Sequence, residues 1–595
     1  GAPIALGAAL YKRSNRKKGI VVANCGDGAC GRGPVLESFN FASMDQITQL
    51  WDGGKGEGMP ILFNVFNNHY GMGGQTRGET MGYDMAARLG AGFNPTMMHA
   101  ERVNGYDPLA VIDAVTRKKE LLVNGKGPAL LDVVTYRVSG HSPSDSSTYR
   151  TPEEIEAWKA ADPIPAFKEK LIKGKIATES EIGAIDSSII DRMTEVIKLA
   201  INDDISPRMD LDKTPDAISS IMFSNQKVHS MDPTRTAEMT KPREECDRLK
   251  EMATKVRTAK DANGKPVPKM KVYNIRDGLC EPIINKFYDD PTLIAYGEDN
   301  RDWGGAFGVY KKITDSIPYH RFFNSPISES AIVGSAVGYA MCGGRVIVEL
   351  MYADFIGCAG DEIINQAAKW QSLSFGRLSL PLILHVPVGF DYGAQHSQDL
   401  SGITAHVPGL KVVYPATPYE AKGMMARALK ENNPVVFFES KRLRGKKEEF
   451  RKKEELEKYY EYPTGNAEII KEGKDVTLLS VGAPLYRTLD AAKILEEKGI
   501  SAEVIDAVSL VPFELEKVLN SVRKTKKILI VSDAADRGSY TKEISHEITE
   551  KAFSYLEKPP VTLGAKNHIV PAYEYDGYHF PSAEKIAKTV TEKLF

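Results

Sequence analysis

The stretch Gly19-Ile20-Val21-Val22-Ala23-Asn24-Cys25-Gly26-Asp27-Gly28-Ala29 decides the fold of this chain. Its apolar first half predicts a buried β-strand, and a Gly-Asp-Gly turn follows at once. Apolar residues then recur at helical spacing between Leu36 and Ala42. In a parallel sheet, a strand–turn–helix junction of this kind lies at the carboxyl end of the strand, where ligands bind.

The turn itself suits a phosphate group. Gly26, Gly28 and Ala29 leave room for a phosphate to approach the backbone, and the start of a helix offers unpaired N–H donors. Asp27 would repel a bare phosphate, so its presence favours a hard cation bound between the two. An ordinary tight turn explains a lone Gly-Asp-Gly equally well.

A second motif, Asn67-Asn68-His69-Tyr70-Gly71-Met72-Gly73, follows the next predicted strand, Ile61–Phe66. Because neighbouring parallel strands end at the same edge, Asp27 and Asn68 can converge on one ion. Their oxygens, a backbone carbonyl that we assign to Tyr70, two phosphate oxygens and a water would complete an octahedral Mg²⁺ site. The alternative is a polar Asn turn, but two motifs in register favour the metal–diphosphate site.

Alternation of strands and helices continues along the chain and predicts an α/β protein of three tandem open parallel-sheet domains. The pattern weakens over residues 216–269, which we interpret as a linker with some helix between a first domain (1–215) and a second (270–458). A charged stretch then separates a third domain, 459–595. The further predicted strands are Ala129–Val134, Thr292–Tyr296, Arg345–Leu350, Leu382–Val386, Val476–Val481, Ala502–Asp506 and Ile528–Val531.

Composition narrows the class of protein. The chain has 595 residues, 42% hydrophobic and 26% charged, which argues against a disordered, collagenous or coiled-coil protein. Lys and Arg total 77 against 79 for Asp and Glu, so no overall charge attracts nucleic acid or an anionic membrane. No apolar run approaches the roughly 20 residues of a membrane helix. The six cysteines form no CxxC pair, which argues against a zinc site and for a reducing cytoplasm or organelle matrix.

The paired Gly-Asp-Gly and Asn-Asn motifs resemble those of thiamine-diphosphate enzymes, and further motifs narrow the resemblance. Residues 136–164 resemble the α subunit, and residues from 270 onward the β subunit, of the decarboxylating first component of the 2-oxo acid and acetoin dehydrogenases. The resemblance covers nearly the whole chain apart from the linker. It implies a transketolase-like fold that binds thiamine diphosphate and Mg²⁺. The motifs include Tyr136-Arg137-Val138-Ser139-Gly140-His141-Ser142, Asp162-Pro163-Ile164, Pro326-Ile327-Ser328-Glu329, Tyr352-Ala353-Asp354-Phe355-Ile356, Gly393-Ala394-Gln395-His396-Ser397-Gln398 and Pro408-Gly409-Leu410-Lys411-Val412-Val413.

The resemblance assigns the pyrimidine half of the cofactor to Glu329 and Phe355. Glu329 matches the glutamate that shares a proton with the distal nitrogen of the aminopyrimidine ring, and its apolar neighbours would raise its pKa. Phe355 matches the aromatic ring that stacks on the pyrimidine. Without the resemblance, Glu329 would be a carboxylate at a helix N-terminus and Phe355 a core residue.

Two histidines complete the site that the resemblance implies. His396 lies in a polar loop after a predicted buried strand, and the implied task is proton transfer during decarboxylation or acyl transfer. His141 is similar to the α-subunit loop histidine that approaches the diphosphate. For a lone loop histidine, a structural role with satisfied hydrogen bonds is the alternative.

Three features depart from the family pattern. The chain enters a predicted buried helix directly at Gly1, so we expect a front segment with further cofactor contacts to be missing. The stretch Gln46–Gly58 lengthens the spacing between the two cofactor motifs, and we interpret it as a surface insertion. The α-like and β-like parts, usually separate chains, are fused, so a homodimer would supply two interfacial sites like those of an α₂β₂ tetramer.

These observations predict thiamine-diphosphate-dependent oxidative decarboxylation of a 2-oxo acid, pyruvate or branched-chain, with acyl transfer to lipoamide. The resemblance implies that the third domain dimerises and docks the core of a dihydrolipoamide acyltransferase, whose lipoyl domain accepts the acyl group. An acetoin-cleaving dehydrogenase component is the alternative. A transketolase-like transferase and an inactive scaffold are two further hypotheses, which the Gln395-His396-Ser397 motif and the intact Asp27, Asn68 and Glu329 disfavour.

Overall fold

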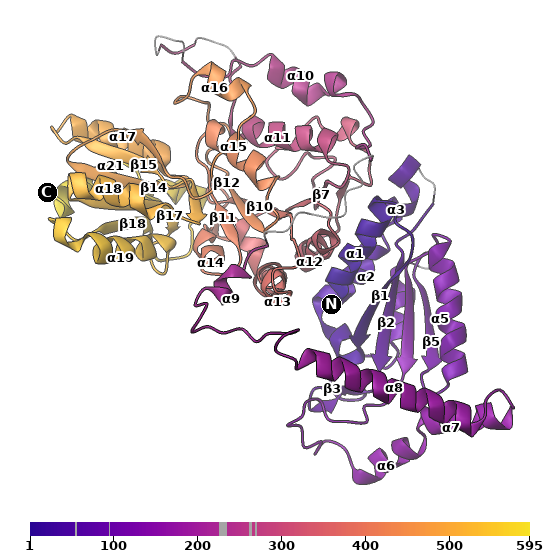
Figure 1. Ribbon diagram of the computed structural model, residues 1–595. Coiled ribbons are helices and arrows are strands. Elements are labelled where there is room, and N and C mark those ends of the chain that lie inside the picture. Colours follow the sequence, from indigo (N-terminus) through magenta and orange to yellow (C-terminus); the bar gives the residue numbers. More distant parts are fainter. Residues whose placement is uncertain (54–55, 95, 225–234, 261–264, 268–270) are drawn as a thin grey trace. The chain divides into compact units, whose positions relative to one another are not determined.

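The computed structural model of the chain describes residues 1–53, 56–94, 96–224, 235–260, 265–267 and 271–595. The chain divides into two compact units, Gly1–Ile221 and Met222–Phe595. Mainly parallel sheets covered by helices form both units, as the alternation of strands and helices predicts (Figure 1). Among the described residues, no helix is both long and apolar enough to cross a membrane. The boundary predicted at residues 269–270 lies outside the described residues.

A four-stranded parallel sheet, in the order β1-β2-β6-β5, forms the centre of the first unit. The helix predicted at the start of the chain is confirmed, and it buries Leu6 and Leu10 completely. The strands are β1 (Val21–Gly26), β2 (Ile61–Asn67), β5 (His99–Asn104) and β6 (Ala129–Val134), and the helices are α1 (Ala2–Ser14), α2 (Gly33–Ala42), α3 (Asp45–Gln49), α4 (Ala86–Phe93) and α5 (Pro108–Val123).

The strand predicted over Gly19–Cys25 is present as β1, but the prediction that it is buried is wrong. β1 is the edge strand of its sheet, so it has a neighbour on one side only. Along β1 only Ala23 is buried, and Val22 is 47% exposed. A short apolar run predicts a strand, but it does not tell an edge position from a central one.

The stretch Gln46–Gly58, interpreted as a surface insertion, is only partly at the surface among the residues that the structure describes: Leu50 is 45% exposed, but other residues are buried. Trp51 is completely buried. The buried carboxylate of Asp52 pairs with Arg13 at 2.6 Å and with Arg16 at 3.2 Å. A buried charge needs such partners when it leaves water, so the end of α1 anchors this segment to the unit.

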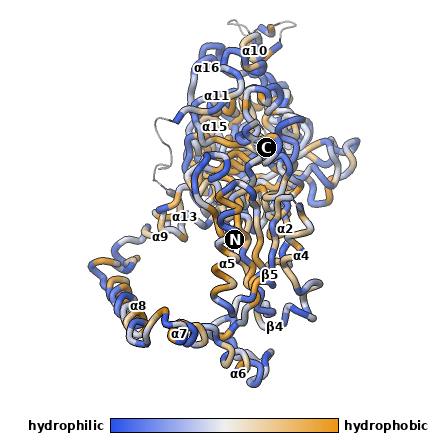
Figure 2. The backbone as a smooth tube through the Cα atoms, turned by 90° about the vertical axis from the view of Figure 1, so that its right-hand side faces the viewer, coloured by the Kyte–Doolittle hydropathy of each residue, from blue (hydrophilic) through white to orange (hydrophobic). Residues whose placement is uncertain are grey.

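After β6 the first unit continues as a series of helices. The longest, α8, begins with a capping box in which Thr178 and Glu181 bond each other's backbone N–H groups. Polar and apolar residues mix along α8 (Figure 2), and none of its residues is buried. Capping and backbone hydrogen bonds therefore support this helix more than packing does. These helices are α6 (Pro152–Ala160), α7 (Pro163–Lys173), α8 (Glu179–Ala200) and α9 (Ala217–Ser220).

Two sheets form the second unit. The larger has seven strands in the order β16-β11-β12-β10-β9-β7-β8, and only β16 is antiparallel to its neighbour. Its strands are β7 (Ile294–Gly297), β8 (Phe322–Asn324), β9 (Val346–Glu349), β10 (Leu382–Val388), β11 (Lys411–Val413), β12 (Val435–Ser440) and β16 (Ser509–Val511). The smaller sheet has five strands in the order β13-β15-β14-β17-β18, namely β13 (Glu468–Lys471), β14 (Val476–Val481), β15 (Ala502–Asp506), β17 (Ile528–Ala535) and β18 (Val561–Ala565).

Helices cover both sheets of the second unit (Figure 1). They are α10 (Asp247–Ala253), α11 (Ile275–Asp289), α12 (Glu329–Met341), α13 (Trp370–Leu373), α14 (Ser401–Ala405), α15 (Pro418–Ala428), α16 (Lys453–Glu457), α17 (Leu485–Glu496), α18 (Leu515–Thr525), α19 (Tyr540–Ala552), α20 (Asp576–His579) and α21 (Ala583–Lys593).

Strand β16 joins the two sheets. It follows β15 of the smaller sheet along the chain, yet it pairs with β11 at the edge of the larger sheet, with Val511 opposite Val412. One hydrophobic cluster runs from α11 through both sheets to α21. The two sheets therefore share a core, which explains why they form one compact unit.

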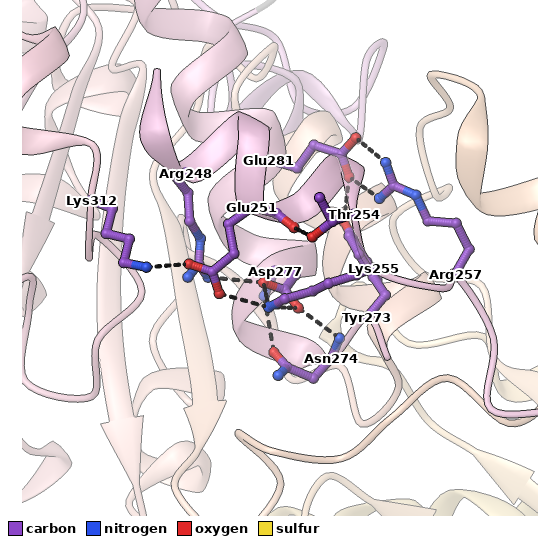
Figure 3. A network of polar contacts seen from close by, with 10 residues as sticks. All are labelled: Arg248, Glu251, Thr254, Lys255, Arg257, Tyr273, Asn274, Asp277, Glu281 and Lys312. Atoms are coloured by element: carbon purple, nitrogen blue, oxygen red, sulfur yellow. Dashed lines mark hydrogen bonds and ion pairs between the residues drawn. The ribbon is translucent and has the colours of Figure 1, made fainter. Parts of the chain in front are cut away.

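A polar network fixes the segment before α11 to the second unit (Figure 3). Asp277, completely buried in the first turn of α11, pairs with Lys255 at 2.8 Å and with Arg248 at 3.0 Å. Arg257 pairs with Glu281 at 3.1 Å, one turn further along α11. Helix α10 and the residues that follow it, inside the predicted linker, are thus held in place by buried charges.

Replacing Asp277 with alanine should strongly destabilise the second unit, because Arg248 and Lys255 would stay buried without their counter-charge. We expect the free energy of unfolding to fall by about 3 kcal/mol, measured by urea denaturation. The control D289A removes the exposed partner of Arg243 and should cost less than about 1 kcal/mol. Equal losses in the two variants would contradict a structural role for this network.

Candidate functional site

The Gly-Asp-Gly turn follows β1 as a short 3₁₀ helix, Asp27–Gly31. Asp27 is buried, and its Oδ2 accepts a hydrogen bond from the Thr76 hydroxyl. Its Oδ1 is also buried and has no hydrogen-bond partner among the described residues. Because an unpaired buried carboxylate oxygen is costly, this atom is suited to bind a cation.

The Asn-Asn motif starts at the same edge of the sheet. β1 and β2 pair in parallel up to Gly26 and Phe66, so the two turns begin at neighbouring strand ends. Backbone from the two turns meets closely: a Cβ added at Gly28 would lie 3.3 Å from the Cα of Gly71. A larger residue at Gly28 would therefore push the two turns apart.

Both remaining predicted metal ligands already have one hydrogen-bond partner. The Oδ1 of Asn68 accepts a hydrogen bond from the Tyr70 N–H at 3.0 Å. The Tyr70 carbonyl accepts one from Arg137 at 3.1 Å, and Arg137 also donates to the Met72 carbonyl at 2.6 Å. Each of these oxygens has a second lone pair, so both can still bind a cation.

Asn67, the neighbour of Asn68, has a structural role instead. It donates to the completely buried Asp132 at 2.9 Å, and Asp132 pairs with Arg102 at 2.9 Å. This network fixes the end of β2, from which the turn carrying Asn68 departs. The two asparagines of the motif therefore have different roles: Asn67 stabilises the end of the strand, and Asn68 keeps an oxygen that can bind a cation.

The predicted His141 lies exposed in a loop that Asp145 holds together. Asp145 accepts hydrogen bonds from the His141 N–H at 2.6 Å and from the Tyr149 hydroxyl at 2.7 Å. These bonds, the one from His141 first, lower the pKa of Asp145 to about 2. The guanidinium of Arg150 lies over the rings of both Tyr70 and Tyr149, so the His141 loop packs against the turn that carries Asn68.

The first unit therefore fits a divalent cation that carries a diphosphate. The unpaired Asp27 oxygen, the Asn68 amide oxygen and the Tyr70 carbonyl are hard oxygen donors, which Mg²⁺ prefers. Across the described part of the chain, no group of three or more His, Cys, Asp or Glu side chains is arranged to hold a metal.

In the second unit, Glu329 is the first residue of α12 and is half-buried. Glu298, directly after β7, has a buried Oε1 without a hydrogen-bond partner among the described residues. Burial first, and then the charges of Glu329, Asp299 and Glu349, raise the pKa of Glu298 to about 7. A carboxyl group with this pKa can hold or release a proton near neutral pH.

Phe355 and His396 lie side by side in the second unit, with ring centroids 5.6 Å apart. Tyr352 completes the cluster, because its ring stacks on the His396 imidazole at 4.2 Å and meets the Phe355 ring at 5.7 Å. The Nδ1 of His396 is buried without a hydrogen-bond partner among the described residues. The structure therefore brings two of the predicted residues together in one aromatic cluster.

A row of three buried titratable residues crosses the neighbouring strands β9, β10 and β12. His385 is completely buried, with Nδ1 2.9 Å from Glu349 and Nε2 3.0 Å from Glu439. Burial alone would lower the pKa of His385, but the two carboxylates outweigh burial and raise it to about 10. The imidazole is therefore charged at neutral pH and links three strands.

The contacts of four residues near the predicted site were not predicted from the sequence. These residues are Thr76, Arg137, Glu298 and Lys441. Glu298 and Lys441 directly follow strands, so the rule that ligands bind at the carboxyl ends of parallel strands would have found them. Arg137 stands in the quoted motif Tyr136–Ser142, shortly after β6, but its contact with the Tyr70 carbonyl was not predicted. Thr76 carries no such signal, because it reaches Asp27 only through a tertiary contact.

Three protein families match successive parts of the chain. The dehydrogenase E1 component family matches residues 1–207. The transketolase pyrimidine binding domain matches residues 273–446, and the transketolase C-terminal domain matches residues 465–586.

Individual relatives match about half of the chain. The β subunit of acetoin:2,6-dichlorophenolindophenol oxidoreductase from Cupriavidus necator is 37% identical over 339 residues, which are 54% of this chain and 97% of that protein. The pyruvate dehydrogenase E1 component subunit β from Acholeplasma laidlawii is 36% identical over 322 residues, 53% of this chain and 97% of that protein. The mitochondrial 2-oxoisovalerate dehydrogenase subunit β from Dictyostelium discoideum is 39% identical over 315 residues, 51% of this chain and 82% of that protein.

Among solved structures, a transketolase from Campylobacter jejuni has a TM-score of 0.61 at 15% identity, and the match covers 100% of this chain and 81% of that one. At this identity the match concerns the fold alone. It confirms the predicted transketolase-like fold.

The charge on His385 should make the stability of the second unit depend on pH. Its pKa rises from 6.5 to about 10 on folding, so its contribution is fully present below pH 6.5 and is lost as the pH rises to about 10. We therefore expect the Tm to fall more steeply between pH 7 and about 10 for the wild type than for His385→Gln, measured by circular dichroism. Parallel curves for the two proteins would contradict this assignment.

Proposed function

Because the chain belongs to the E1 components of the thiamine-diphosphate-dependent 2-oxo acid and acetoin dehydrogenases, we propose that it oxidatively decarboxylates a 2-oxo acid and transfers the acyl group to lipoamide. Pyruvate and branched-chain 2-oxo acids are the proposed substrates. The observation that carries the proposal is that one chain holds both residue sets, Asp27 with Asn68 in the first unit and Phe355 with His396 in the second.

We assign diphosphate binding to the first unit. The cation would bind the unpaired Oδ1 of Asp27, the Oδ1 of Asn68 and the Tyr70 carbonyl, all oxygens that suit Mg²⁺. Gly28 would let the two turns pack closely, since a Cβ there would lie 3.3 Å from the Cα of Gly71, and the backbone N–H groups that follow would face the phosphate. His141 would bind the phosphate oxygens from its loop.

We assign pyrimidine binding to the second unit. Thiamine diphosphate, when bound, supplies the electron sink that allows the bond between the carbonyl and carboxylate carbons to break. Glu329 would hold a proton at the distal ring nitrogen, and Phe355 would stack on the ring. The half-buried position of Glu329 at the start of α12 leaves its carboxyl group accessible for this task.

His396 is the proposed proton-transfer residue. Its Nδ1 is buried and has no hydrogen-bond partner among the described residues, so the nitrogen keeps an unused hydrogen-bonding position. Stacking on Tyr352 fixes the plane of the imidazole ring. An imidazole with a fixed ring plane and an unpaired ring nitrogen is suited to proton transfer.

The proposed partner is the lipoyl domain and core of a dihydrolipoamide acyltransferase. Several relatives are named as subunits of E1 components, which supports membership of such a complex. We further propose a homodimer as the functional form, because closed two-fold symmetry is the commonest assembly of identical chains. The cytoplasm or an organelle matrix is the proposed location.

Acetoin cleavage is the second candidate. The relative named for acetoin is 37% identical and the one named for pyruvate is 36% identical, so identity does not choose between the substrates. A transketolase activity has weaker support, because the resemblance to transketolases concerns the fold alone.

A dye-reduction assay with added thiamine diphosphate and Mg²⁺ tests the proposal. Pyruvate, branched-chain 2-oxo acids and acetoin are offered separately, and we expect turnover with a 2-oxo acid. Turnover with acetoin alone would favour the second candidate. If the full chain turns over none of these substrates in the presence of both cofactors, the proposal is contradicted.

Glu329→Gln should lower the turnover number by about 100-fold or more, because the amide cannot share a proton with the ring nitrogen. Binding of the cofactor, measured by calorimetry, should stay within about threefold, since the diphosphate is held elsewhere. The matched control is E584Q, which alters an exposed carboxylate in the first turn of α21 and should leave turnover unchanged. An unchanged rate in E329Q would mean that another acid serves the pyrimidine ring.

A further inference from the structure

Lys441 is a buried lysine at the base of the loop that carries His396. It follows β12 directly and is 3% exposed. Its N–H donates to the carbonyl of Val388, the last residue of β10, at 3.1 Å. Its backbone is therefore fixed at the point where the chain leaves β10 and enters the His396 loop.

The ammonium group of Lys441 contacts His396 in two ways. It donates a hydrogen bond to the His396 carbonyl. It also lies over the rings of Tyr392 and Tyr352, 4.6 and 4.8 Å from their centroids, and the Tyr352 ring stacks on the His396 imidazole. The face of an aromatic ring attracts an ammonium group, and the attraction is stronger when the ammonium is desolvated. One cation thus holds both the main chain of His396 and the ring that supports its side chain.

The charges around this ammonium belong to different elements. Burial first lowers the pKa of Lys441 to about 8, Asp354, Asp391 and Asp576 oppose that change, and Arg444 adds to it. Asp391, within the loop, also donates its N–H to Asp576 of α20 at 3.1 Å. A second cation, Arg442, lies over the ring of Phe390 in the same loop at 3.5 Å, so the ammonium of Lys441 is one of the positive groups that face the carboxylates around the loop.

We propose that Lys441 is a positioning residue that holds the His396 loop and the His396 imidazole in place through its protonated ammonium group. The inference rests on the proposed role of His396 as the proton-transfer residue. Lys441 itself does not exchange a proton with the substrate. Its effect on the reaction is exerted through the carbonyl of His396 and the ring of Tyr352.

The same unit offers a matched control, Lys422. Its side chain is also buried, at 5% exposure, and donates to a main-chain carbonyl, that of Leu456, at 2.6 Å. It also lies over a tyrosine ring, Tyr460, at 5.4 Å. Lys422 therefore shares burial, carbonyl bond and aromatic contact with Lys441, and it also pairs with Glu281 at 3.3 Å. It touches no residue of the His396 loop among its described contacts.

The experiment compares K441M and K422M in the full-length protein. Amide hydrogen exchange is measured over residues 389–400, and thermal unfolding is followed in parallel. We expect exchange in this segment to be at least about 10-fold faster in K441M and unchanged in K422M. Equal exchange in the two variants would overturn the proposal, and this readout needs no enzymatic activity.

Kinetics separate the inference from the proposed function. With a substrate that the wild type turns over, K441M should lose about 10-fold or more in kcat with KM changed less than about threefold, whereas K422M should keep its kcat. The kcat of the wild type should fall above pH 8, where the ammonium loses its proton, and K441R should move that fall to higher pH because a guanidinium stays charged. A K441M enzyme with the kcat of K422M would overturn the inference, while an inactive wild type would contradict only the proposed function.

Discussion

Parallel pairing of strands is the constraint on which the candidate site depends. In a parallel sheet the carboxyl ends of neighbouring strands meet at one edge, so the polar residues that follow them gather there. In the first unit, β1 and β2 stay in register from Val21 and Ile61 to Gly26 and Phe66. The two turns that follow therefore start side by side, and the close approach of Gly28 to Gly71 is a consequence of that register.

The same constraint sets the geometry around His396. β10 and β12 pair in register up to Val388 and Ser440, so the His396 loop and Lys441 leave the sheet at neighbouring points. A shift of one residue would turn the Lys441 side chain to the opposite face of the sheet. The buried row of Glu349, His385 and Glu439 links β9, β10 and β12 and opposes such a shift. A charge network inside the sheet thus helps to preserve the position of residues beyond its edge.

Sequence reasoning found the strands whose side chains are apolar, because burial imposes that composition. Ala129–Val134 and Val476–Val481 have the predicted bounds in the structure. The strand His99–Asn104 was missed, since a polar edge strand carries no apolar run. The pairing of β16 with β11 could not be predicted from the sequence either, because a contact between two sheets depends on tertiary packing. The burial of Trp51 within an apparent insertion has the same cause.

The residues of the site also differ in whether a sequence motif marks them. Asp27, Asn68 and His396 stand in motifs of fixed spacing, so a single sequence contains their signal. Lys441 stands in a charged stretch where any lysine suggests an exposed surface, and only the structure reveals that it is buried against His396. Glu298 follows a predicted strand, but its raised pKa depends on burial and on carboxylates distant in sequence.

Hydrogen-bond satisfaction separates structural from functional polar groups when it is combined with position. Asp277 and Asp132 are completely buried, and charged partners satisfy both of them. The Oδ1 of Asp27, the Oε1 of Glu298 and the Nδ1 of His396 are buried with no partner among the described residues. Leaving such an atom unsatisfied costs about 1–3 kcal/mol, so a ligand that supplies the missing bond recovers that energy on binding.

An unpaired buried atom is not sufficient by itself. The Ser480 hydroxyl also lacks a partner among the described residues, yet it lies inside β14, where no ligand can reach it. Asp27 and Glu298 instead follow the last residues of β1 and β7, and His396 lies in the loop after β10. These three groups share an unsatisfied atom and a place at the carboxyl end of a parallel strand, a combination that Ser325, directly after β8, also has.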